Sequence, residues 1–217
     1  MEINLLNKYP KTKRNLDERS SIKDQNIIST ARKFGKDFFD GDRKFGYGGF
    51  NYNPKYWNEV VKDFFNFYNL KENSTILDVG CAKGFMLFDF LKNYPNLKVK
   101  GIDISQHAID NSKSEVSQFL DVGNAKKLSF EDNSFDLVIS INTVHNLEID
   151  ECKIAIKEIQ RVSNKNSFIT VDAYRNNKEK EKMYKWNLTA KTIYSVKEWK
   201  VLFEQVGYKG DYYWFIP

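Results

Sequence analysis

A glycine-rich segment with an acidic residue in front of it is the clearest chemical signal in the chain. The segment Asp78–Gly84 (DVGCAKG) directly follows a short apolar run. Gly80 can adopt backbone angles that other residues avoid, and it lets a ligand approach the main chain closely. A carboxylate two residues before that glycine suits a cationic group on the ligand. The segment therefore predicts a turn that holds a small, partly cationic ligand.

Two familiar nucleotide-binding turns do not match this segment. A phosphate-binding loop would need GxxxxGK[ST], which is absent. A dinucleotide-binding GxGxxG turn would need glycine where the chain has Ala82 and Phe85. The segment instead fits the pattern acid-x-G-x-G-x-G, with alanine in place of the middle glycine.

The elements that must position this turn alternate in type. Apolar spacing predicts helices over 56–70, 85–91, 106–114 and 152–162. The alternation predicts an α/β fold, Rossmann-like, with a mostly parallel sheet of six or seven strands and helices on both faces. Ligands of such sheets bind beyond the carboxyl ends of the strands, where the candidate residues stand. The strands are expected at Thr75–Val79, Val99–Ile104, Ser117–Val122, Phe135–Ile141 and Phe168–Val171.

The last part of the sheet is less regular. We expect a turn at Ser163–Ser167, whose asparagines tolerate left-handed backbone angles. After Gly207 one clear strand follows, Asp211–Ile216, and the tail from residue 174 contains one clear helix.

Over about residues 56–173 the chain resembles the class I S-adenosylmethionine (SAM)-dependent methyltransferase superfamily, close to the group labelled type 11. Four motifs carry the resemblance, in order and correctly spaced. They are the Asp78–Gly84 turn with Asp103 after it, Val122–Val138 (like GDAxxLPFxDxSFDxV), Ser140–Leu147 (like SNxLHHL), and Glu158 with Arg161-Val162 (like ExxRV). The family often ends in an antiparallel strand pair, which the single strand after Gly207 does not supply.

The resemblance implies SAM as methyl donor, S-adenosylhomocysteine as its product, and no metal. Asp78 would meet the methionine amine, and Asp103 would accept bonds from both ribose hydroxyls. Asn124 stands where the family usually has an aspartate near the adenine, and its oxygen can still accept a bond. The expected cofactor-binding residues are Asp78, Gly80, Cys81, Ala82, Gly84, Asp103, Ile104, Asn124, Ala125 and Asn142.

Methyl transfer is an in-line displacement, and a base is needed only when the nucleophile arrives protonated. His145 follows the fourth strand and is the candidate catalytic base, because histidine titrates near neutral pH. The alternative is a structural loop histidine that bonds the backbone. The candidate substrate-binding residues are Arg43, Tyr47, Asn146, Asp172, Tyr174 and Arg175.

We expect residues 1–55 to form an N-terminal leader and 56–217 to form the methyltransferase domain. The leader's residues 1–36 carry nine Lys/Arg and four Asp/Glu, which is the whole net charge of +5. Such an arm either binds nucleic acid or anionic membrane or is simply solvated. Its end, rich in glycine and aromatic residues, suggests a lid at 38–57 over the methyl-transfer site.

These observations favour a small-molecule acceptor, possibly a sugar or an amine. One alternative is an RNA or DNA methyltransferase, but Ile141–Val144 does not match [DNS]PP[YFW], and we do not expect a nucleic-acid partner. The other alternative is a catalytically inactive SAM-binding regulatory domain. No apolar run reaches the ~20 residues that span a bilayer. Two cysteines without a CxxC motif suggest neither a disulfide framework nor a zinc site, so a cytoplasmic protein is expected.

Overall fold

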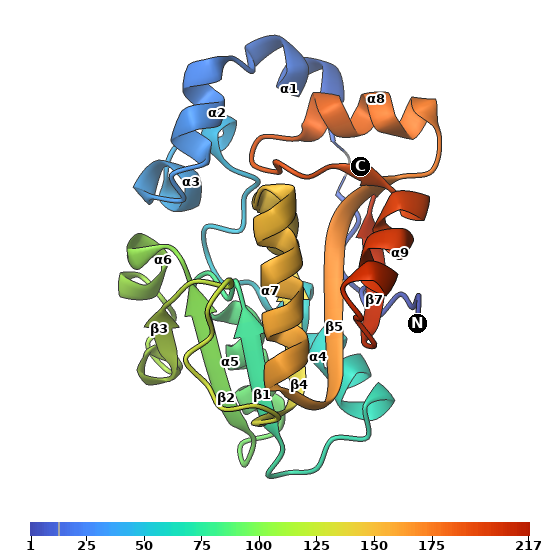
Figure 1. Ribbon diagram of the computed structural model, residues 1–217. Helices are drawn as coiled ribbons and strands as arrows, with labels where there is room; N and C mark the ends of the chain where they lie inside the picture. Colours follow the sequence, from blue (N-terminus) through green and yellow to red (C-terminus); the bar gives the residue numbers. More distant parts are fainter. Residues whose placement is uncertain (13) are drawn as a thin grey trace.

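A seven-stranded sheet forms the centre of the protein in the computed structural model, which describes residues 1–12 and 14–217 (Figure 1). The strand order is β3-β2-β1-β4-β5-β6, and β7 also pairs with β5. Every strand pair in this described part is parallel, as the predicted α/β fold requires. The strands are β1 (Thr75–Val79), β2 (Lys98–Asp103), β3 (Leu120–Val122), β4 (Phe135–Ile141), β5 (Ser163–Tyr174), β6 (Tyr194–Ser195) and β7 (Asp211–Phe215).

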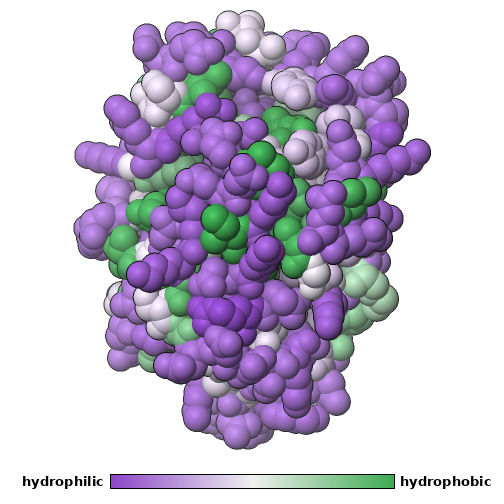
Figure 2. All heavy atoms as spheres, viewed as in Figure 1, coloured by the Kyte–Doolittle hydropathy of each residue, from purple (hydrophilic) through white to green (hydrophobic). Residues whose placement is uncertain are grey.

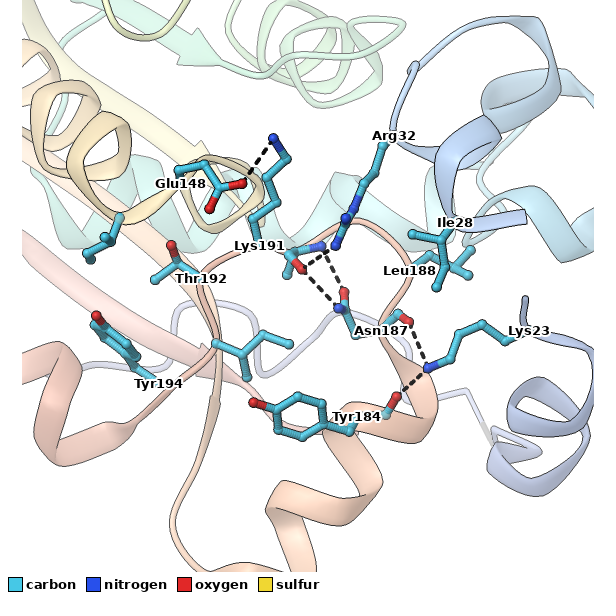
Figure 3. A pocket seen from close by; sticks show the side chains of 13 residues that line it. Lys23, Ile28, Arg32, Glu148, Tyr184, Asn187, Leu188, Lys191, Thr192 and Tyr194 are labelled. Atoms are coloured by element: carbon cyan, nitrogen blue, oxygen red, sulfur yellow. Dashed lines mark hydrogen bonds and ion pairs between the residues drawn. The ribbon is translucent and has the colours of Figure 1, made fainter. Parts of the chain in front are cut away.

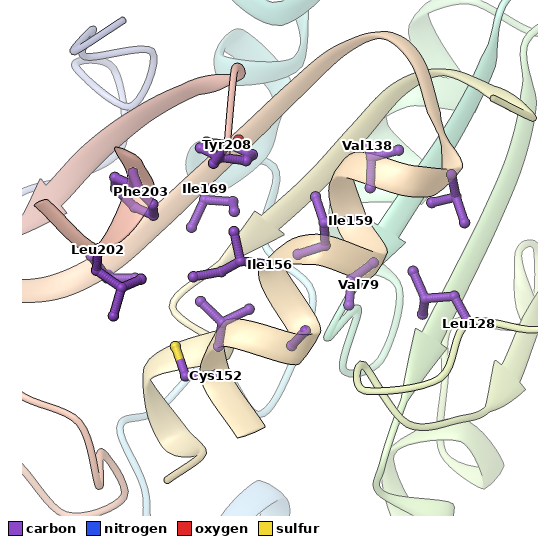
Figure 4. Packing of buried hydrophobic residues seen from close by; sticks show 14 of the residues in the cluster. Val79, Leu128, Val138, Cys152, Ile156, Ile159, Ile169, Leu202, Phe203 and Tyr208 are labelled. Atoms are coloured by element: carbon purple, nitrogen blue, oxygen red, sulfur yellow. The ribbon is translucent and has the colours of Figure 1, made fainter. Parts of the chain in front are cut away.

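Helices cover both faces of the sheet, as predicted. On one face, α4 (Pro54–Phe67) and α5 (Phe85–Asn93) pack against residues such as Ile76 and Leu137. On the other, α7 (Ile149–Val162) packs over Val79 and Val138, and α9 (Val196–Gln205) packs over β5 through Leu202 and Phe203 (Figure 4). The viewed surface is mainly hydrophilic, with apolar side chains in small separate groups, because the apolar stripes of these helices face inward (Figure 2).

Local sequence signals explain where several elements begin. Pro54 occupies the first turn of α4 and Asn53 caps it, accepting a bond from the N–H of Lys55. Ser195 and Glu198 form a reciprocal capping box at the start of α9. The central strand β1 is apolar and buried along almost its whole length, as a parallel strand covered on both faces must be.

The strands at the β5 edge of the sheet differ from the family pattern in their direction. The tail supplies two strands rather than one, and both run parallel to β5, where an antiparallel pair is common. Glu2 extends this edge further through a parallel bridge to Tyr212. The tail also contains two helices, α8 (Asn177–Trp186) and α9, where one was predicted.

Three predicted boundaries are corrected. The expected turn at 163–167 is part of β5, which absorbs the extra residues as a bulge opposite Phe135 and Leu137, with no left-handed asparagine. The third strand begins only at Leu120, after a short 3-10 turn at Ser117–Phe119. The helix expected over 106–114 is α6 and ends at Asp110.

The leader contains helices that apolar spacing did not reveal: α1 (Leu16–Ile22), α2 (Gln25–Ala31), α3 (Lys36–Asp40) and the short turn η1 (Arg43–Phe45). Together with α8 they lie above the carboxyl ends of the strands (Figure 1). Capping starts the first two, since Asn15 and Asp24 each accept a bond from the N–H three residues later. Lys13, one of the leader's basic residues, lies outside the described residues. No helix in the described chain is long and apolar enough to cross a membrane.

Candidate functional site

The glycine turn joins β1 to α5, as predicted, and is tightly bent. Gly80, Ala82 and Gly84 all have positive φ, at 87°, 49° and 74°. Thr143, from the loop after β4, packs on Gly80 so closely that a Cβ there would lie 2.1 Å from its Oγ1. Ala82 holds a left-handed conformation that costs an L-residue about 1–2 kcal/mol. The turn therefore keeps its backbone slim at the end of β1, at a cost in strain.

Asp78 and Asp103 place two buried carboxylates beside this turn. Burial, together with the charge of Asp103, raises the pKa of Asp78 to about 7. Burial also raises the pKa of Asp103, although its oxygens accept bonds from the N–H groups of Ala82 (2.8 Å) and Ser105 (2.9 Å). Neither forms an ion pair with any described residue. Two buried carboxylates without a cation make a site for a cationic ligand with hydroxyl groups.

The residues expected around an adenine lie on the same side of the sheet. Ile104 follows Asp103 and is 57% exposed, which leaves an apolar surface for a flat ring. The Asn124 side-chain oxygen accepts a bond from the N–H of Lys126 at 2.9 Å and keeps a second lone pair. Ala125 is half-buried beside it. Asn142 takes a left-handed φ of 53°, and its oxygen accepts from the Thr170 hydroxyl at 3.0 Å.

A cluster that sequence reasoning missed ties the leader to this site. The Asp40 carboxylate, at the end of α3, meets Lys83 of the glycine turn and His107 Nε2 of α6, the latter at 2.7 Å. Lys83 is buried and also donates to the carbonyl of Phe50 at 3.0 Å. Lys83 adds a positive charge to a turn that is expected to hold a cationic ligand group. This mismatch is the sequence signal that could have indicated an acidic partner for Lys83 elsewhere in the chain.

His145 lies in the short turn η3 (Val144–Asn146) and is buried. Its Nδ1 accepts a bond from the backbone N–H of Asp172 at 2.9 Å, so the ring proton is on Nε2. Burial lowers the pKa of His145 to about 3. These contacts fit the structural alternative, a neutral histidine that bonds backbone, better than a base that takes up a proton near neutral pH.

Asp172 lies beside His145 at the carboxyl end of β5. Its Oδ1 is 3.8 Å from His145 Nε2, and its backbone oxygen accepts from Trp199 Nε1 at 2.9 Å. Burial raises the pKa of Asp172 to about 7, although the nearby charge of Arg14 opposes the shift. Burial thus moves the pKa of Asp172 toward neutrality and that of His145 away from it.

The leader's two candidate substrate residues, Tyr47 and Arg43, both make contacts within the protein. The Tyr47 hydroxyl accepts from the N–H groups of Leu188 (2.7 Å) and Thr189 (3.2 Å), which fixes the leader to the tail. Arg43 donates to the carbonyl of Gly46, and its guanidinium lies 5.9 Å from the centre of the Trp186 ring. Both side chains therefore lie beside Trp186 of α8.

The other three candidates divide between the site and its surroundings. Asn146 Nδ2 donates to the carbonyl of Asn142 at 3.2 Å, and its buried Oδ1 has no partner among the described residues. The Tyr174 hydroxyl lies 3.5 Å from Glu198, and Arg175 pairs with Glu179 at 3.3 Å, so their contacts are with α9 and α8. The structure brings together Asn142, Asn146, His145 and Asp172, but it turns Tyr174 and Arg175 outward. Within the described residues no group of His, Cys, Asp or Glu is arranged to hold a metal ion.

Comparison with known proteins gives this geometry a class. The chain matches the family described as "Methyltransferase domain" over residues 70–213, which is more than half of its length. It is 35% identical over 102 residues to ajmaline N-methyltransferase of Rauvolfia serpentina, covering 43% of this chain and 33% of that protein. It is 32% identical over 114 residues to demethylmenaquinone methyltransferase of Staphylococcus aureus, covering 50% and 45%. The chain thus spans less than half of each relative's length.

Solved structures share the fold at low identity. The YcgJ protein of Bacillus subtilis superposes with a TM-score of 0.55 at 17% identity, covering 67% of this chain and 66% of that one. A putative sarcosine dimethylglycine methyltransferase of Galdieria sulphuraria gives 0.56 at 15% identity, covering 69% and 60%. The sheet and the glycine turn are those of the class I methyltransferase fold that these proteins share. The chain belongs to the methyltransferase domain family.

Proposed function

We propose that this methyltransferase acts on a small-molecule metabolite, a sugar or an amine, held between the glycine turn and the leader. The observation that carries the proposal is the pair of buried carboxylates, Asp78 and Asp103, which lacks a cation among the described residues. SAM supplies a methyl group activated by its sulfonium, and its amine and ribose hydroxyls match these two carboxylates. The backbone of the turn would lie close to SAM at four residues, Gly80, Cys81, Ala82 and Gly84.

The acceptor side is assigned to the loops after β4 and β5. There Asp172 can receive a hydrogen bond or a proton from a protonated acceptor, since its pKa is near 7. His145, held neutral by burial, would position Asp172 rather than take the proton itself. The unpartnered oxygen of Asn146 is a second acceptor atom in this region.

The leader is assigned the role of a lid. It joins the glycine turn through Asp40 and Lys83, and the tail through Tyr47. Such a cover would exclude water, which competes with the acceptor. A leader fixed at both ends favours a small acceptor over a polynucleotide. Two relatives support an amine: ajmaline N-methyltransferase, and the phosphoethanolamine N-methyltransferase 3 of Arabidopsis thaliana, 30% identical over 95 residues.

Calorimetry followed by turnover tests the proposal. SAM and S-adenosylhomocysteine should bind the full chain, and NAD should bind far more weakly. Release of S-adenosylhomocysteine should then be measured over a panel of sugars, amines and short RNA and DNA oligonucleotides. Tighter binding of NAD would overturn the cofactor assignment. Turnover on an oligonucleotide alone would establish the nucleic-acid alternative, and SAM binding without turnover on any class would favour the regulatory one.

A further inference from the structure

A pocket of about 480 Å³ lies between the leader and the tail, away from the glycine turn (Figure 3). One wall comes from the end of α1 and from α2, with Lys23, Ile28 and Arg32. The opposite wall is the loop 187–194, and Glu148 at the start of α7 closes one end. No described residue that we assign to SAM lines it. A cavity of this size accommodates a small organic molecule.

The charged side chains of the pocket do not balance. Lys191 pairs with Glu148 at 3.4 Å. Lys23 Nζ instead donates to backbone carbonyls, among them that of Asn187 at 3.1 Å, and Arg32 Nη2 donates to the carbonyl of Ala190 at 3.2 Å. A carbonyl dipole does not neutralise a full charge, and neither cation pairs with a carboxylate in the described part of the chain. The pocket therefore keeps two uncompensated positive charges, and burial with the nearby charge of Arg19 lowers the pKa of Lys23.

Arg32 is the cation best placed to meet a ligand. It is exposed at the pocket, and a guanidinium has five N–H donors, of which one makes a hydrogen bond to a described residue. The remaining donors keep the planar fork that matches a carboxylate or a phosphate. Lys23, whose ammonium already meets several carbonyls, contributes mainly its charge.

Apolar and aromatic groups complete the walls. Ile28 and the buried Leu188 form an apolar floor, and the rings of Tyr184 and Tyr194 stand at the pocket, Tyr184 being 51% exposed. The exposed Tyr184 ring lies across the pocket from Arg32 and offers a surface on which a flat organic body can pack (Figure 3). The pocket thus combines an anion-binding end with an apolar one.

We propose that this pocket binds a small organic anion, a carboxylate or phosphate ester on a flat apolar body, with Arg32 receiving the anionic group. The site is separate from the SAM site and does not rest on the proposed function. It gives the basic leader a role in binding a small molecule rather than nucleic acid. Its far wall touches the catalytic side, because the N–H groups of Lys191 and Thr192 both donate to the His145 carbonyl at 3.0 Å.

Binding of model anions tests the proposal. Phenyl phosphate and benzoate are titrated into the full chain with saturating S-adenosylhomocysteine present, and phenol and inorganic phosphate are titrated in parallel. One of the two aryl anions should bind more tightly than both of the simpler compounds, and which one does identifies the anionic group. In methyl-resolved NMR the signals of Ile28 and Ile193 should shift, while that of Ile104 at the cofactor site should not.

A matched pair of variants locates the anion. Arg32→Gln should weaken binding of the aryl anion by about tenfold or more, because a charge-assisted hydrogen bond is lost. Lys33→Gln removes the same charge from the neighbouring exposed position, which does not line the pocket, and should change the affinity less than twofold. Thermal melting and binding of S-adenosylhomocysteine show whether each variant is folded.

Four results would overturn the proposal. Phenol binding as tightly as the better of the two aryl anions would show that Arg32 receives no anionic group. Competition between the aryl anion and S-adenosylhomocysteine would move the site to the cofactor pocket. Equal losses in the two variants, or unshifted Ile28 and Ile193 signals at saturation, would reduce the effect to the general positive charge of the leader.

Discussion

The backbone N–H of Asp172 donates to His145 Nδ1 at 2.9 Å, which joins the ends of β4 and β5 through a neutral imidazole. We predict that His145→Ala lowers the free energy of unfolding by about 2–4 kcal/mol, since it leaves a buried N–H without a partner and opens a cavity. His145→Asn places an oxygen near the former Nδ1 and should lower the free energy of unfolding clearly less. Urea denaturation of both variants measures the difference, and equal losses would show that the bond contributes little.

Asp78 should make SAM binding depend on pH. Its pKa is about 7 in the free protein, and a bound cation would favour the carboxylate. Affinity should therefore rise severalfold between about pH 6 and about pH 7.5, as the free protein loses the proton that binding must otherwise displace. Asp78→Asn should bind SAM weakly with no such slope. Calorimetry in two buffers of different ionisation enthalpy would also reveal the released proton, and a pH-independent affinity in the wild type contradicts the assignment.

The raised pKa of Asp78 affects stability in the opposite direction: a higher pH should strengthen SAM binding but lower the free energy of unfolding of the free protein. A carboxyl whose pKa is raised from 3.8 to about 7 on folding favours the native state at low pH, and this contribution is lost as the pH rises through about 7. The loss runs from about pH 4 to about pH 7, so without SAM, Asp78→Asn should be more stable than the wild type at about pH 8, and the difference should shrink as the pH falls toward about 4. The Asp78→Asn variant should therefore gain stability and lose SAM affinity. If it loses both, the variant is simply misfolded.

Asp103→Ala should weaken SAM binding by well over tenfold while the fold persists. Two bonds to the ribose hydroxyls are worth about 2–4 kcal/mol together once water replaces them in part. Asp121→Ala is the matched control, because Asp121 lies on the neighbouring strand β3 with an exposed side chain. An Asp103 variant whose affinity stays within twofold of the wild type would remove Asp103 from the cofactor site.

Ala82→Gly should stabilise the protein by about 0.5–1 kcal/mol without loss of SAM binding. Glycine relieves the left-handed strain at φ 49°, which outweighs the greater freedom of the unfolded chain. Ala155→Gly, inside α7, should have the opposite effect and cost about 1 kcal/mol or more. Denaturant midpoints compare the two, and a destabilised Ala82→Gly would mean that the methyl group packs usefully in the turn.

Asp40→Ala should release the leader from the glycine turn, because Lys83 and His107 both lose their partner. We expect tryptic cleavage within 36–44 to become about tenfold faster and SAM binding to weaken. Asp37→Ala changes an exposed acid on the same helix and should leave both properties unchanged. Deleting residues 1–36 is a poorer test of the basic arm, because Arg19 donates to the carbonyls of Arg43 and Gly46 and so also supports the segment that we propose as a lid.

The sheet could be predicted because its information is local. Short runs such as Ile76-Leu77 and Leu137–Ile139 are apolar and fully buried, which is typical of parallel strands covered on both faces. The glycine turn could also be predicted, because the left-handed backbone at Gly80 and Gly84 restricts the residue type. The leader helices stayed hidden because five to seven residues are too few for helical spacing to appear, and their stability comes from tertiary contacts. The environment of His145 depends on a residue 27 positions away, which no local pattern encodes.

The pairing of early with late segments sets an order of assembly. Tyr47 is held by the N–H groups of Leu188 and Thr189, and Glu2 bridges to Tyr212. During synthesis the leader emerges first, yet it can reach its final position only after the tail has left the ribosome. The core strands β1 to β4 can pair earlier, since their partners are closer in sequence. The cover over the carboxyl ends is therefore the last part of the protein to assemble, so the nascent chain exposes the residues that we assign to the cofactor before it can shield them.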